Sequence, residues 1–222
     1  MITARLHCII NHVNGSIAAD IGTDHAYVPI RLIDEKRVEK VIASDVKKGP
    51  VESALRTVKK YNMDSKIDIR LGAGLSVLKE NEADIIIIAG MGGILISEIL
   101  EAGKSTAENA ELILQPMNCQ YELRKYLIKN GYTITGEDIA VEGFKVYNLL
   151  TVRKGIQQPF SKDIYYHLPP CLYGHKHFNE LYKKKKREFT KVIKGLENSK
   201  QTDTEKLKQY KDWLKELERI EI

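Results

Sequence analysis

The chain has 222 residues, of which 43% are hydrophobic and 29% are charged, a composition typical of globular proteins. No apolar run approaches the roughly 20 residues that a membrane-spanning helix needs, and the first residues lack the pattern of a secretory signal. The three cysteines are odd in number and form no Cys-x-x-Cys pair: Cys8, Cys119 and Cys171. These features argue against a membrane protein, a disulfide framework and a zinc ribbon, and they predict a protein of the reducing cytoplasm.

The net charge of +5 is concentrated near the C-terminus. Residues 1–159 contain 20 Lys and Arg and 20 Asp and Glu, whereas residues 160–222 contain 15 and 10. This uneven distribution predicts two domains, 1–159 and 160–222. The neutral domain would carry out the chemistry, and the basic domain would bind an anionic partner.

The predicted elements of residues 1–159 alternate between helices and strands. An amphipathic helix is expected from Thr3 to Val13, with Thr3 as its N-cap. The alternation that follows predicts a parallel sheet, because parallel strands need a crossover. Four consecutive isoleucines at 85–88 predict a central strand that is covered on both faces. Strands are expected at 17–21, 41–44, 67–71, 84–89 and 111–114, and helices at 26–33, 50–61, 75–79, 94–100 and 121–129.

Two strand-like runs at 132–140 and 145–153 have no room for a helix between them, so they are expected to form an antiparallel hairpin. Parallel strands closed by such a hairpin form the α/β sheet of Rossmann-like class I methyltransferases, whereas a dehydrogenase would add another parallel strand through a helix. Beyond residue 160, apolar residues recur at spacings of three and four on both sides of a polar loop. This pattern predicts an antiparallel helical hairpin that packs like a coiled coil. The residues in the pattern are Phe178, Tyr182, Lys185, Phe189, Val192 and Leu196, followed by Leu207, Tyr210, Leu214 and Leu217.

The end of the first strand carries two acids and one glycine, Asp20, Gly22 and Asp24. It lacks the Gly-x-Gly-x-x-Gly sequence that admits a pyrophosphate, and its carboxylates would repel a phosphate at a helix N-terminus. The turn therefore favours a nucleoside without phosphates and with a cationic centre, such as S-adenosylmethionine, whose ammonium group Asp20 could hold. The alternative is that Asp20 and Asp24 only cap the next helix.

The ends of the next strands carry further candidate cofactor residues. Asp45 follows the second strand, where a carboxylate can accept both ribose hydroxyls of an adenosine; the alternative is a loop acid without a function. Ala73 stands between Gly72 and Gly74, where many methyltransferases have an acid near the adenine. The glycine-rich segment 89–93 would place bare backbone where the methyl group is delivered, and it also suits a tight turn.

Enzymes that methylate exocyclic amines usually carry Asn/Asp-Pro-Pro-aromatic after the fourth strand, and this chain has no such sequence there. Gln115-Pro116-Met117-Asn118, after the fifth strand, is the only similar segment. A ring nitrogen of a base has an available lone pair at neutral pH, so it needs alignment with the methyl group rather than a strong base. The sequence therefore favours a ring nitrogen as the methyl acceptor.

Several of these segments together resemble the bacterial tRNA adenine-N1 methyltransferases that act at tRNA position 22, the TrmK type. The resemblance covers the whole chain, including the basic hairpin. It implies a class I methyltransferase fold, S-adenosylmethionine as cofactor with S-adenosylhomocysteine as product, no metal, and methylation of N1 of an adenine in the D-arm. The segments are Asp20–Tyr27, Ala43–Val46, Gly90–Gly93, Leu114–Pro116, and Leu123–Leu127 with Asn130 and Gly131.

The resemblance implies a cofactor pocket at the strand ends and identifies no catalytic base. We hypothesise that N1 of the adenine attacks the methyl group in line, and that Asp24 and Tyr27 stabilise the cationic product. His25 and Asn118 would hold the edge of the base, which has to leave its stack. The expected catalytic residues are Asp24, Tyr27 and Asn118, and the expected cofactor residues are Asp20, Gly22, Thr23, Asp24, His25, Asp45, Val46, Gly72, Ala73, Gly74, Ala89, Gly90, Met91 and Gly92.

The basic C-terminal domain is predicted to bind tRNA through phosphate contacts, which give affinity without sequence choice; a solvated helix face is the alternative. His175 and His177 could be metal ligands, but no third ligand is near them in the sequence, so we expect polar or phosphate-facing roles and no metal. No obligate protein partner is evident. The expected RNA-binding residues are Lys176, Lys183, Lys184, Lys186, Arg187 and Lys191.

Other interpretations stay open from the sequence. The chain could methylate another RNA or a small molecule. It could also be a non-catalytic RNA-binding protein that keeps the fold, although the intact Asp20, Gly22 and Asp45 argue against this. A nicotinamide oxidoreductase is disfavoured by the missing glycines and by the terminal hairpin.

Overall fold

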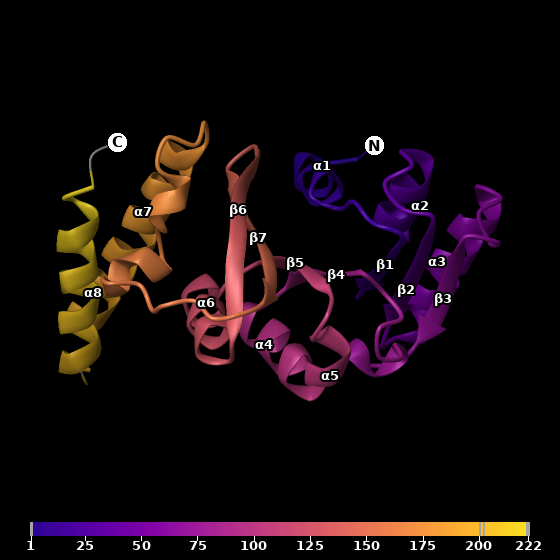
Figure 1. Cartoon of the computed structure of the whole chain (residues 1–222). Coiled ribbons are helices and arrows are strands. Elements are labelled where there is room, and N and C mark those ends of the chain that lie inside the picture. Colours follow the sequence, from indigo (N-terminus) through magenta and orange to yellow (C-terminus); the bar gives the residue numbers. More distant parts are fainter. Residues whose placement is uncertain (1, 200, 202, 221–222) are drawn as a thin grey trace.

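A mixed α/β sheet and a C-terminal pair of long helices lie side by side in the computed structural model (Figure 1). The structure describes residues 2–199, 201 and 203–220. Within this part of the chain, no helix has both the length and the apolar character needed to cross a membrane. The helices are α1 (Ala4–Asn11), α2 (Tyr27–Asp34), α3 (Lys48–Lys60), α4 (Gly93–Ala102), α5 (Lys104–Ala107), α6 (Gln120–Lys129), α7 (Phe178–Glu197) and α8 (Thr204–Leu217). The strands are β1 (Ile17–Ile21), β2 (Lys40–Asp45), β3 (Ile67–Leu71), β4 (Ile85–Met91), β5 (Glu111–Pro116), β6 (Tyr132–Glu142) and β7 (Lys145–Lys154), and short 3₁₀ helices are η1 (Gly74–Val77), η2 (Asp163–Tyr166) and η3 (Pro170–Leu172).

The sheet has the strand order β3-β2-β1-β4-β5-β7-β6. Strands β1 to β5 pair in parallel, and β7 and β6 add an antiparallel hairpin next to β5. The predicted α/β class and its closing hairpin are thus confirmed. Ile21 pairs with both Ser44 and Ile88, and Asp45 pairs with Leu71. Because parallel strands end at the same edge, the loops after β1, β2, β3 and β4 meet along one side of the sheet.

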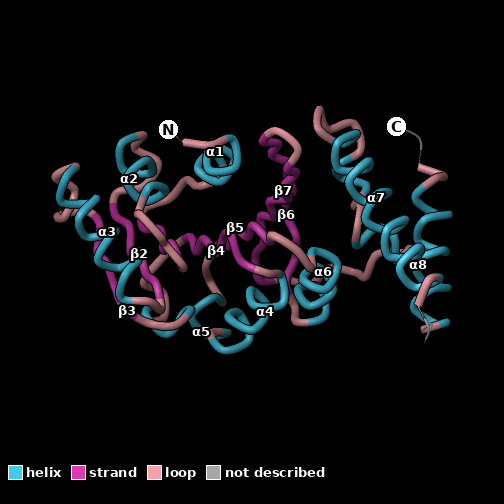
Figure 2. Tube along the Cα trace, turned by 180° about the vertical axis from the view of Figure 1, so that it is seen from behind, coloured by secondary structure: helices cyan, strands magenta, loops and turns pink. Residues whose placement is uncertain are grey.

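Helices cover both faces of the sheet. Ile85 and Ile87 of β4 pack into a core with α1, α2 and α3, whereas Ile86 and Ile88 pack into a second core with α4 and α6. Figure 2 shows the two groups of helices on opposite sides of the strands. All four isoleucines are nearly inaccessible to solvent, which confirms the predicted central strand, and burying each one contributes roughly 2 kcal/mol.

Local sequence signals set most element boundaries. The Thr3 hydroxyl accepts a hydrogen bond from the Leu6 amide at 3.4 Å, which confirms the predicted N-cap of α1. The short helix expected at 75–79 is the 3₁₀ helix η1, and the sequence pattern gives no sign of α5. Strand β6 continues two residues beyond the expected end at Ala140, because Val141 and Glu142 still pair with β7.

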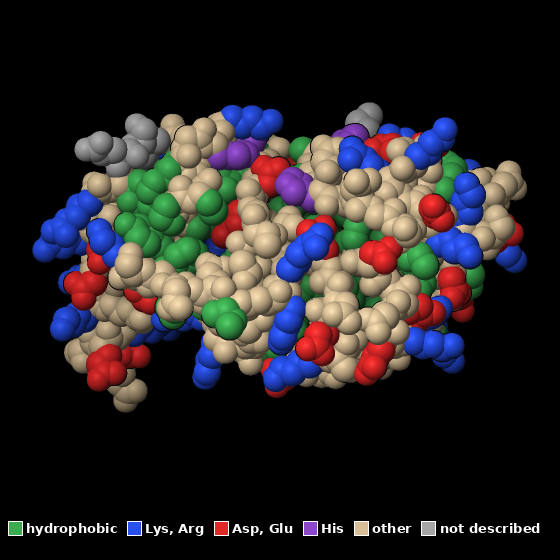
Figure 3. Space-filling view, in the orientation of Figure 1, with side chains coloured by type: hydrophobic (Ala, Val, Ile, Leu, Met, Phe, Trp, Pro, Cys, Tyr) green, Lys and Arg blue, Asp and Glu red, His purple; other side chains and the backbone are tan. Residues whose placement is uncertain are grey.

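The C-terminal helices α7 and α8 form the expected helical hairpin (Figure 1), but the buried side differs from the predicted series. That series omits Leu181, Ile193 and Trp213, which the structure buries. The reason is that α7 packs against the sheet as well as against α8, in a third core that includes Ile139 and Val146. The buried face is therefore wider than one coiled-coil seam. The outer edge of the hairpin carries basic and acidic side chains in a mixture (Figure 3).

A buried ion pair connects the sheet to the segment that leads into α7. The side chains of Arg124 on α6 and Glu137 on β6 are both fully buried, and Arg124 Nε donates to Glu137 Oε1 at 3.0 Å. Arg124 Nη1 also donates to the Tyr166 carbonyl of η2 at 2.8 Å. Such a pair tolerates replacement poorly when only one partner is removed, because the other charge stays buried.

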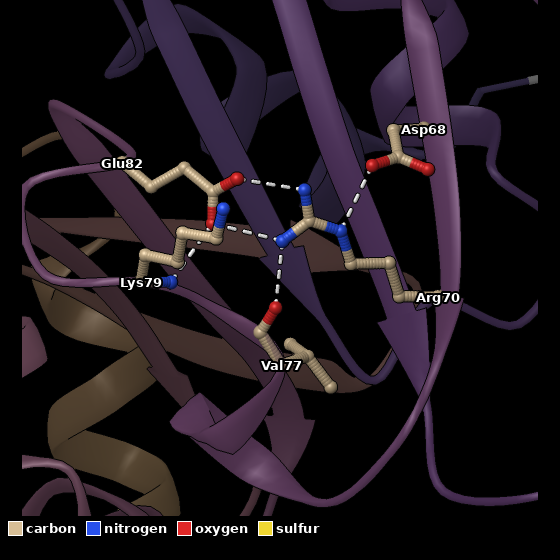
Figure 4. Close-up of polar contacts among 5 residues, drawn as sticks. All are labelled: Asp68, Arg70, Val77, Lys79 and Glu82. Atoms are coloured by element: carbon tan, nitrogen blue, oxygen red, sulfur yellow. Dashed lines mark hydrogen bonds and ion pairs between the residues drawn. The ribbon is translucent and has the colours of Figure 1, made fainter.

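A more exposed network fixes the loop between β3 and β4 (Figure 4). Arg70 of β3 binds Glu82 through two nitrogens at 2.7 and 2.8 Å. The same guanidinium reaches Asp68 at 2.8 Å and the Val77 carbonyl at 2.6 Å. The hydrogen bonds from Arg70 lower the pKa of the Glu82 carboxyl group to about 2. The network ties the loop that leaves β3 to the strand itself.

Replacing Arg124 with Met should destabilise the protein by about 3–5 kcal/mol, because the Glu137 carboxylate would remain buried without a partner. The measurement is urea unfolding followed by circular dichroism. Arg153→Met is the matched control, since Arg153 is 63% exposed in its pair with Glu111 and should lose less than about 1 kcal/mol. Equal losses in the two variants would contradict the structural role of the buried pair.

Candidate active site

A cleft of about 270 Å³ opens at the end of β1, between α1 and the start of α2. Helix α1 forms one wall through Arg5, Leu6 and Ile9. The turn after β1 forms the other wall, together with one residue from the end of β4. The cleft brings together seven residues that the sequence singled out: Asp20, Gly22, Thr23, Asp24, His25, Tyr27 and Ala89.

Two amides of the turn after β1 are already hydrogen-bonded. The N–H groups of Gly22 and Thr23 both donate to the Ser44 carbonyl of β2 at 2.8 Å. Gly22 has a φ of +87°, a conformation that favours glycine, and a Cβ at this position would lie 2.2 Å from Met91 Cε, so the end of the methionine side chain would have to move. Pro29, in the first turn of α2, has no N–H to donate. The Gly22 and Thr23 amides and Pro29 are therefore not available as donors to a phosphate, unlike the amides in the anion-binding loops of dinucleotide sites.

Asp20 is almost fully buried, with 7% of its surface exposed. Burial raises the pKa of its carboxyl group to about 6; a hydrogen bond with Thr23 and the charge of Arg5 act in the opposite direction, and Asp45 adds to the increase. A poorly hydrated carboxylate gains from a nearby positive charge. This end of the cleft is therefore suited to hold a cationic group.

Arg5 is a residue of the cleft that sequence reasoning missed. Its Nη1 donates to Gln115 Oε1 at 3.0 Å, and the Gly90 amide donates to the same oxygen at 3.2 Å. The Arg5 amide donates to Glu142 Oε1 at 2.6 Å. Arg5 lies upstream of the first strand in a helix that carries no recognisable motif. Only the fold reveals that it lies over the ends of β4 and β5.

Asp45 lies at the end of β2, next to the end of β1. Its Oδ1 accepts a hydrogen bond from the Lys47 amide at 2.8 Å, whereas its Oδ2 makes no hydrogen bond within the described part of the chain. The Asp45 carbonyl accepts the Gly72 amide at 3.0 Å, which joins the loops after β2 and β3. Val46 is 63% exposed and provides an apolar surface beside the free carboxylate oxygen.

Ala73 and Gly74 do not line the cleft at β1. They line a separate hollow of about 310 Å³ between η1 and α4. Gly74 has a φ of +53°, and a Cβ there would lie 3.2 Å from Ile99, so backbone conformation and packing explain this glycine. Three residues of this loop, Gly72, Ala73 and Gly74, were expected to bind the cofactor. Among them, the structure places Gly72 next to Asp45.

The loops after β4 and β5 pack closely against each other. A Cβ on Gly92 would lie 2.9 Å from Asn118 Oδ1, and one on Gly93 would lie 2.3 Å from the Cys119 carbonyl oxygen. The Gly93 amide donates to the Asn118 carbonyl at 3.0 Å. The absence of side chains at these positions therefore lets Asn118 lie directly over the end of β4.

The expected catalytic residues lie on two sides of the strand ends. Asp24 Oδ2 is 3.3 Å from His25 Nε2, and His25 Nδ1 is 2.6 Å from Ser53 Oγ of α3. The rings of His25 and Tyr27 are 5.4 Å apart, and the side chains of Asp24 and Tyr27 face solvent. Asn118 lies instead in a second cleft of about 300 Å³, between the start of α6 and α7. Asp24 and Tyr27 are thus grouped, whereas Asn118 approaches from the β5 side.

Four of the expected RNA-binding residues are well exposed: Lys176, Lys183, Arg187 and Lys191. The last three follow one another at intervals of four residues, so they share one face of α7. This face is opposite the one that packs against the sheet and α8. None of the three forms an ion pair with another described residue. We call Lys183, Arg187 and Lys191 the basic face.

The other two lysines of the expected set have partners within the protein. Lys184 Nζ donates to the Val146 carbonyl of β7 at 2.8 Å, and burial lowers the pKa of this lysine. Lys186 pairs with Glu218, which follows α8, at 2.9 Å. Lys184 therefore holds α7 against the sheet, and Lys186 connects the two arms of the hairpin.

His175 makes a polar contact, as one of its two expected roles predicts, with a residue that is distant in the sequence. His175 Nε2 lies 2.8 Å from Asp138 Oδ1, and the ligand atoms of Asp138, Cys8 and His12 lie within 4.8 Å of one another. These residues come from distant parts of the sequence, so only the fold brings them together. None of them lines the cleft at β1.

Comparison with known proteins assigns the chain to a family. The sequence model of the TrmK family, described as tRNA (adenine(22)-N(1))-methyltransferase, matches residues 18–219. The chain belongs to the TrmK family. The turn after β1, the strand ends and the C-terminal hairpin all lie within the matched residues. The family resemblance expected from the sequence is confirmed.

Known TrmK proteins are similar over most of the structure. The tRNA (adenine(22)-N(1))-methyltransferase of Bacillus subtilis is 42% identical over 156 residues, which are 69% of this chain and 66% of that protein. The crystal structure of the B. subtilis m1A22 tRNA methyltransferase TrmK has a TM-score of 0.87 and 32% identity, covering 98% of this chain and 97% of that one. Sp1610 of Streptococcus pneumoniae, solved in complex with S-adenosyl-L-methionine, has a TM-score of 0.86 and 31% identity, covering 98% of both chains.

The Asp20→Asn variant should be more stable than the parent protein above pH 6. The raised pKa means that folded Asp20 binds its proton more tightly than in the unfolded chain, so its contribution to stability falls as the pH rises from 3.8 to about 6. The amide avoids the buried charge, and the gain at neutral pH is up to about 3 kcal/mol. Urea unfolding of both proteins at about pH 4 and pH 7.5 tests this. A stability difference that does not change with pH would contradict it.

Proposed function

We propose that this chain transfers a methyl group from S-adenosylmethionine to N1 of the adenine at position 22 in the D-arm of tRNA. The observation that carries the proposal is a buried Asp20 and a half-buried Asp45 at neighbouring strand ends, beside a turn in which the Gly22 and Thr23 amides are already occupied. Membership of the TrmK family supports it. The activity in the name of the B. subtilis relative and the ligand of Sp1610 support it further.

The residues at the strand ends fit S-adenosylmethionine. Asp20 holds the ammonium group, and the free Oδ2 of Asp45 accepts hydrogen bonds from the ribose hydroxyls. Val46 covers one side of the nucleoside, and the exposed backbone at Gly90 and Gly92 borders the reacting centre. When bound, the cofactor supplies an electrophilic methyl group on a positively charged sulfur atom. The occupied turn amides agree with a ligand that has no phosphate.

The acceptor base is oriented rather than deprotonated, because adenine N1 has a lone pair at neutral pH. Asn118 lies over Gly92, where its amide can both donate to and accept from the edge of the base. The product base is cationic, and the Asp24 carboxylate and the Tyr27 ring stabilise this charge. Ser53 and Asp24 lie beside the two ring nitrogens of His25, which gives His25 a positioning role in this proposal. It orients Asp24.

The C-terminal residues 160–222 form the tRNA-binding unit in this proposal. The basic face of α7 presents three cationic groups that form no ion pair with the described residues, so no such pair has to break before they contact a phosphate. Phosphate contacts of this kind position a nucleic acid without reading its sequence. Selection of the nucleotide then depends on the Asn118 and Asp24 side chains at the strand ends.

Methylation of a tRNA transcript with labelled S-adenosylmethionine tests the proposal. Label should enter the tRNA, and reverse transcription of the product should stop at position 22. A transcript with guanine at position 22 is the control and should give no stop. Transfer only to ribosomal RNA or to small molecules, or stops at another nucleotide, would overturn the assignment.

Asp45→Ala should weaken the binding of S-adenosylmethionine roughly 10- to 100-fold, because hydrogen bonds to a charged group contribute about 1.5–3 kcal/mol. Isothermal titration calorimetry measures the affinity. Asp64→Ala is the matched control, because Asp64 is an exposed acid in the turn before β3. An unchanged affinity in the Asp45 variant would rule out the ribose contact.

Replacing Lys183, Arg187 and Lys191 together with Gln should reduce the salt dependence of tRNA binding. Each lost phosphate contact lowers the slope of log K against log salt by about 0.7–0.9, so the slope should fall by roughly two units. Filter binding at several salt concentrations gives the slope. Gln replacements of Lys59, Lys60 and Lys66 remove the same charge from the far end of the sheet and should leave the slope nearly unchanged. A similar effect of both triple variants would contradict a specific basic face.

A further inference from the structure

A cluster of metal-binding side chains lies where α1, β6 and the segment before α7 meet. Cys8 and His12 come from α1 and its C-cap, and Asp138 comes from β6. One ligand atom from each of them lies within 4.8 Å of the other two, and all three residues are half-buried. Figure 3 shows histidine side chains beside an acidic one near the upper edge of the molecule. We propose that Cys8 Sγ, His12 Nε2 and Asp138 Oδ2 bind one zinc ion.

The hydrogen bond of His12 Nδ1 leaves the lone pair of Nε2 available to a metal. His12 Nδ1 lies 2.8 Å from the Cys8 carbonyl oxygen, and because a carbonyl only accepts, Nδ1 carries the proton. In the neutral ring Nε2 then has a lone pair, which faces Asp138 Oδ2 at 3.5 Å. Two acceptors facing each other repel unless a cation lies between them. A backbone carbonyl that fixes the tautomer in this way is the usual outer partner of a metal-binding histidine.

The distance between the two atoms also favours a metal over a direct ion pair. A charge-assisted hydrogen bond between a protonated His12 and Asp138 would bring them to about 2.7–2.9 Å. Two ligands of a tetrahedral zinc ion, with bonds of about 2.0–2.1 Å, lie roughly 3.4 Å apart. The observed 3.5 Å matches the second geometry.

The other Asp138 oxygen, Oδ1, has two partners of its own, and the Cys8 thiol is also hydrogen-bonded with this carboxylate. Asp138 Oδ1 accepts the Ile139 amide at 2.7 Å and lies 2.8 Å from His175 Nε2. His175 Nδ1 accepts the His177 amide at 3.0 Å, so the proton of the neutral His175 ring is on Nε2 and is donated to Asp138. His175 is thus an outer partner that orients the carboxylate. These contacts fix the orientation of the Asp138 carboxylate, as the outer partners of a metal ligand do.

The donor set selects the class of metal. A thiolate, an imidazole and a carboxylate together suit Zn²⁺, whereas Mg²⁺ and Ca²⁺ prefer oxygen ligands alone. Cys8 and His12 are four residues apart, so they share one side of the helix. Binding displaces the thiol proton to solvent, since the thiolate is the ligand. Three protein ligands leave a fourth position for water.

The site would fasten α1 to the sheet. The same helix carries Arg5, which contacts Gln115 over the strand ends. A zinc ion at Cys8 and His12 would fix the C-terminal end of the helix to β6, and His175 would connect the site to the start of α7. The ion would hold these elements together, with its fourth position open to water, and it lies outside the cleft at β1. The proposal stands on this geometry alone and does not depend on the proposed methyl transfer.

Metal titration of the full-length protein tests the site. Protein treated with a chelator should bind one Zn²⁺ per chain in isothermal titration calorimetry, with a higher melting temperature after binding. Co²⁺ should give the charge-transfer absorption of a cobalt–thiolate bond. Cys8→Ser should abolish this absorption and weaken zinc binding at least 10-fold, whereas Cys171→Ser, at an exposed thiol, should change neither.

The His175→Gln variant distinguishes the effect of losing the outer partner from the effect of losing a ligand. It should weaken zinc binding about 10- to 100-fold, the usual effect of losing an outer partner, while the cobalt–thiolate absorption remains. Circular dichroism of each variant without metal controls for folding. No stoichiometric zinc binding by the parent protein, or equal binding by Cys8→Ser and the parent, would overturn the proposal whether or not tRNA is methylated.

Discussion

The carboxylate of Asp20 is held at the end of β1 with very little contact with water, and the cleft is organised around this placement. Burial favours the protonated form of a carboxyl group, and the hydrogen bond with Thr23 and the charge of Arg5 offset only part of the effect. A cationic ligand would supply the missing partner. The neighbouring backbone, in contrast, already has its hydrogen-bond partner, because the Gly22 and Thr23 amides both donate to the Ser44 carbonyl. The cleft thus places a buried carboxylate, which favours a positively charged ligand, beside two amides that are not available to a negatively charged one.

Two parts of the chain that are distant in sequence complete this arrangement. Helix α1 covers the strand ends with Arg5, and its other end lies against Asp138 through Cys8 and His12. The C-terminal hairpin reaches the opposite end of the site, where the buried Lys185 of α7 donates to Gln120 at the start of α6 at 3.2 Å. Asn118 lies two residues before Gln120, so the proposed tRNA-binding unit and the proposed base-holding residue share one rigid connection.

Sequence reasoning succeeded where function follows from strand order. Asp20 and Asp45 could be placed together because apolar runs end directly before them, and parallel strands end at one edge. It failed where packing between distant elements decides the outcome. Periodicity could not show that Trp213 rather than Leu214 is buried, because α8 also packs against η2, where Trp213 donates a hydrogen bond to Asp163. Periodicity also could not show that Lys184 donates a hydrogen bond to β7.

The same limit applies to single residues whose partners lie far along the chain. Arg5 has no local motif, and its position over Gln115 depends on how α1 folds back across the sheet. His175 seemed isolated because Asp138 is 37 residues away in the sequence. Ala73 and Gly74 follow a strand end as expected, yet the 3₁₀ turn that begins at Gly74 directs them towards α4. Short-range patterns locate the edge of the sheet but not the direction in which each loop leaves it.

The double hydrogen bond to the Ser44 carbonyl has a consequence for competition inside a cell. ATP, ADP and NAD share the adenosine portion with S-adenosylmethionine and differ from it in their phosphates. In the proposed adenosine pocket, two turn amides are already bound to β2 and Asp24 adds a negative charge, so the phosphates of those metabolites gain little there. The contribution of the two amides resides in the main chain, so exchanging the Asp24 side chain alone would not remove it. Inhibitors built on adenosine should accordingly carry neutral or positively charged groups at the 5′ position.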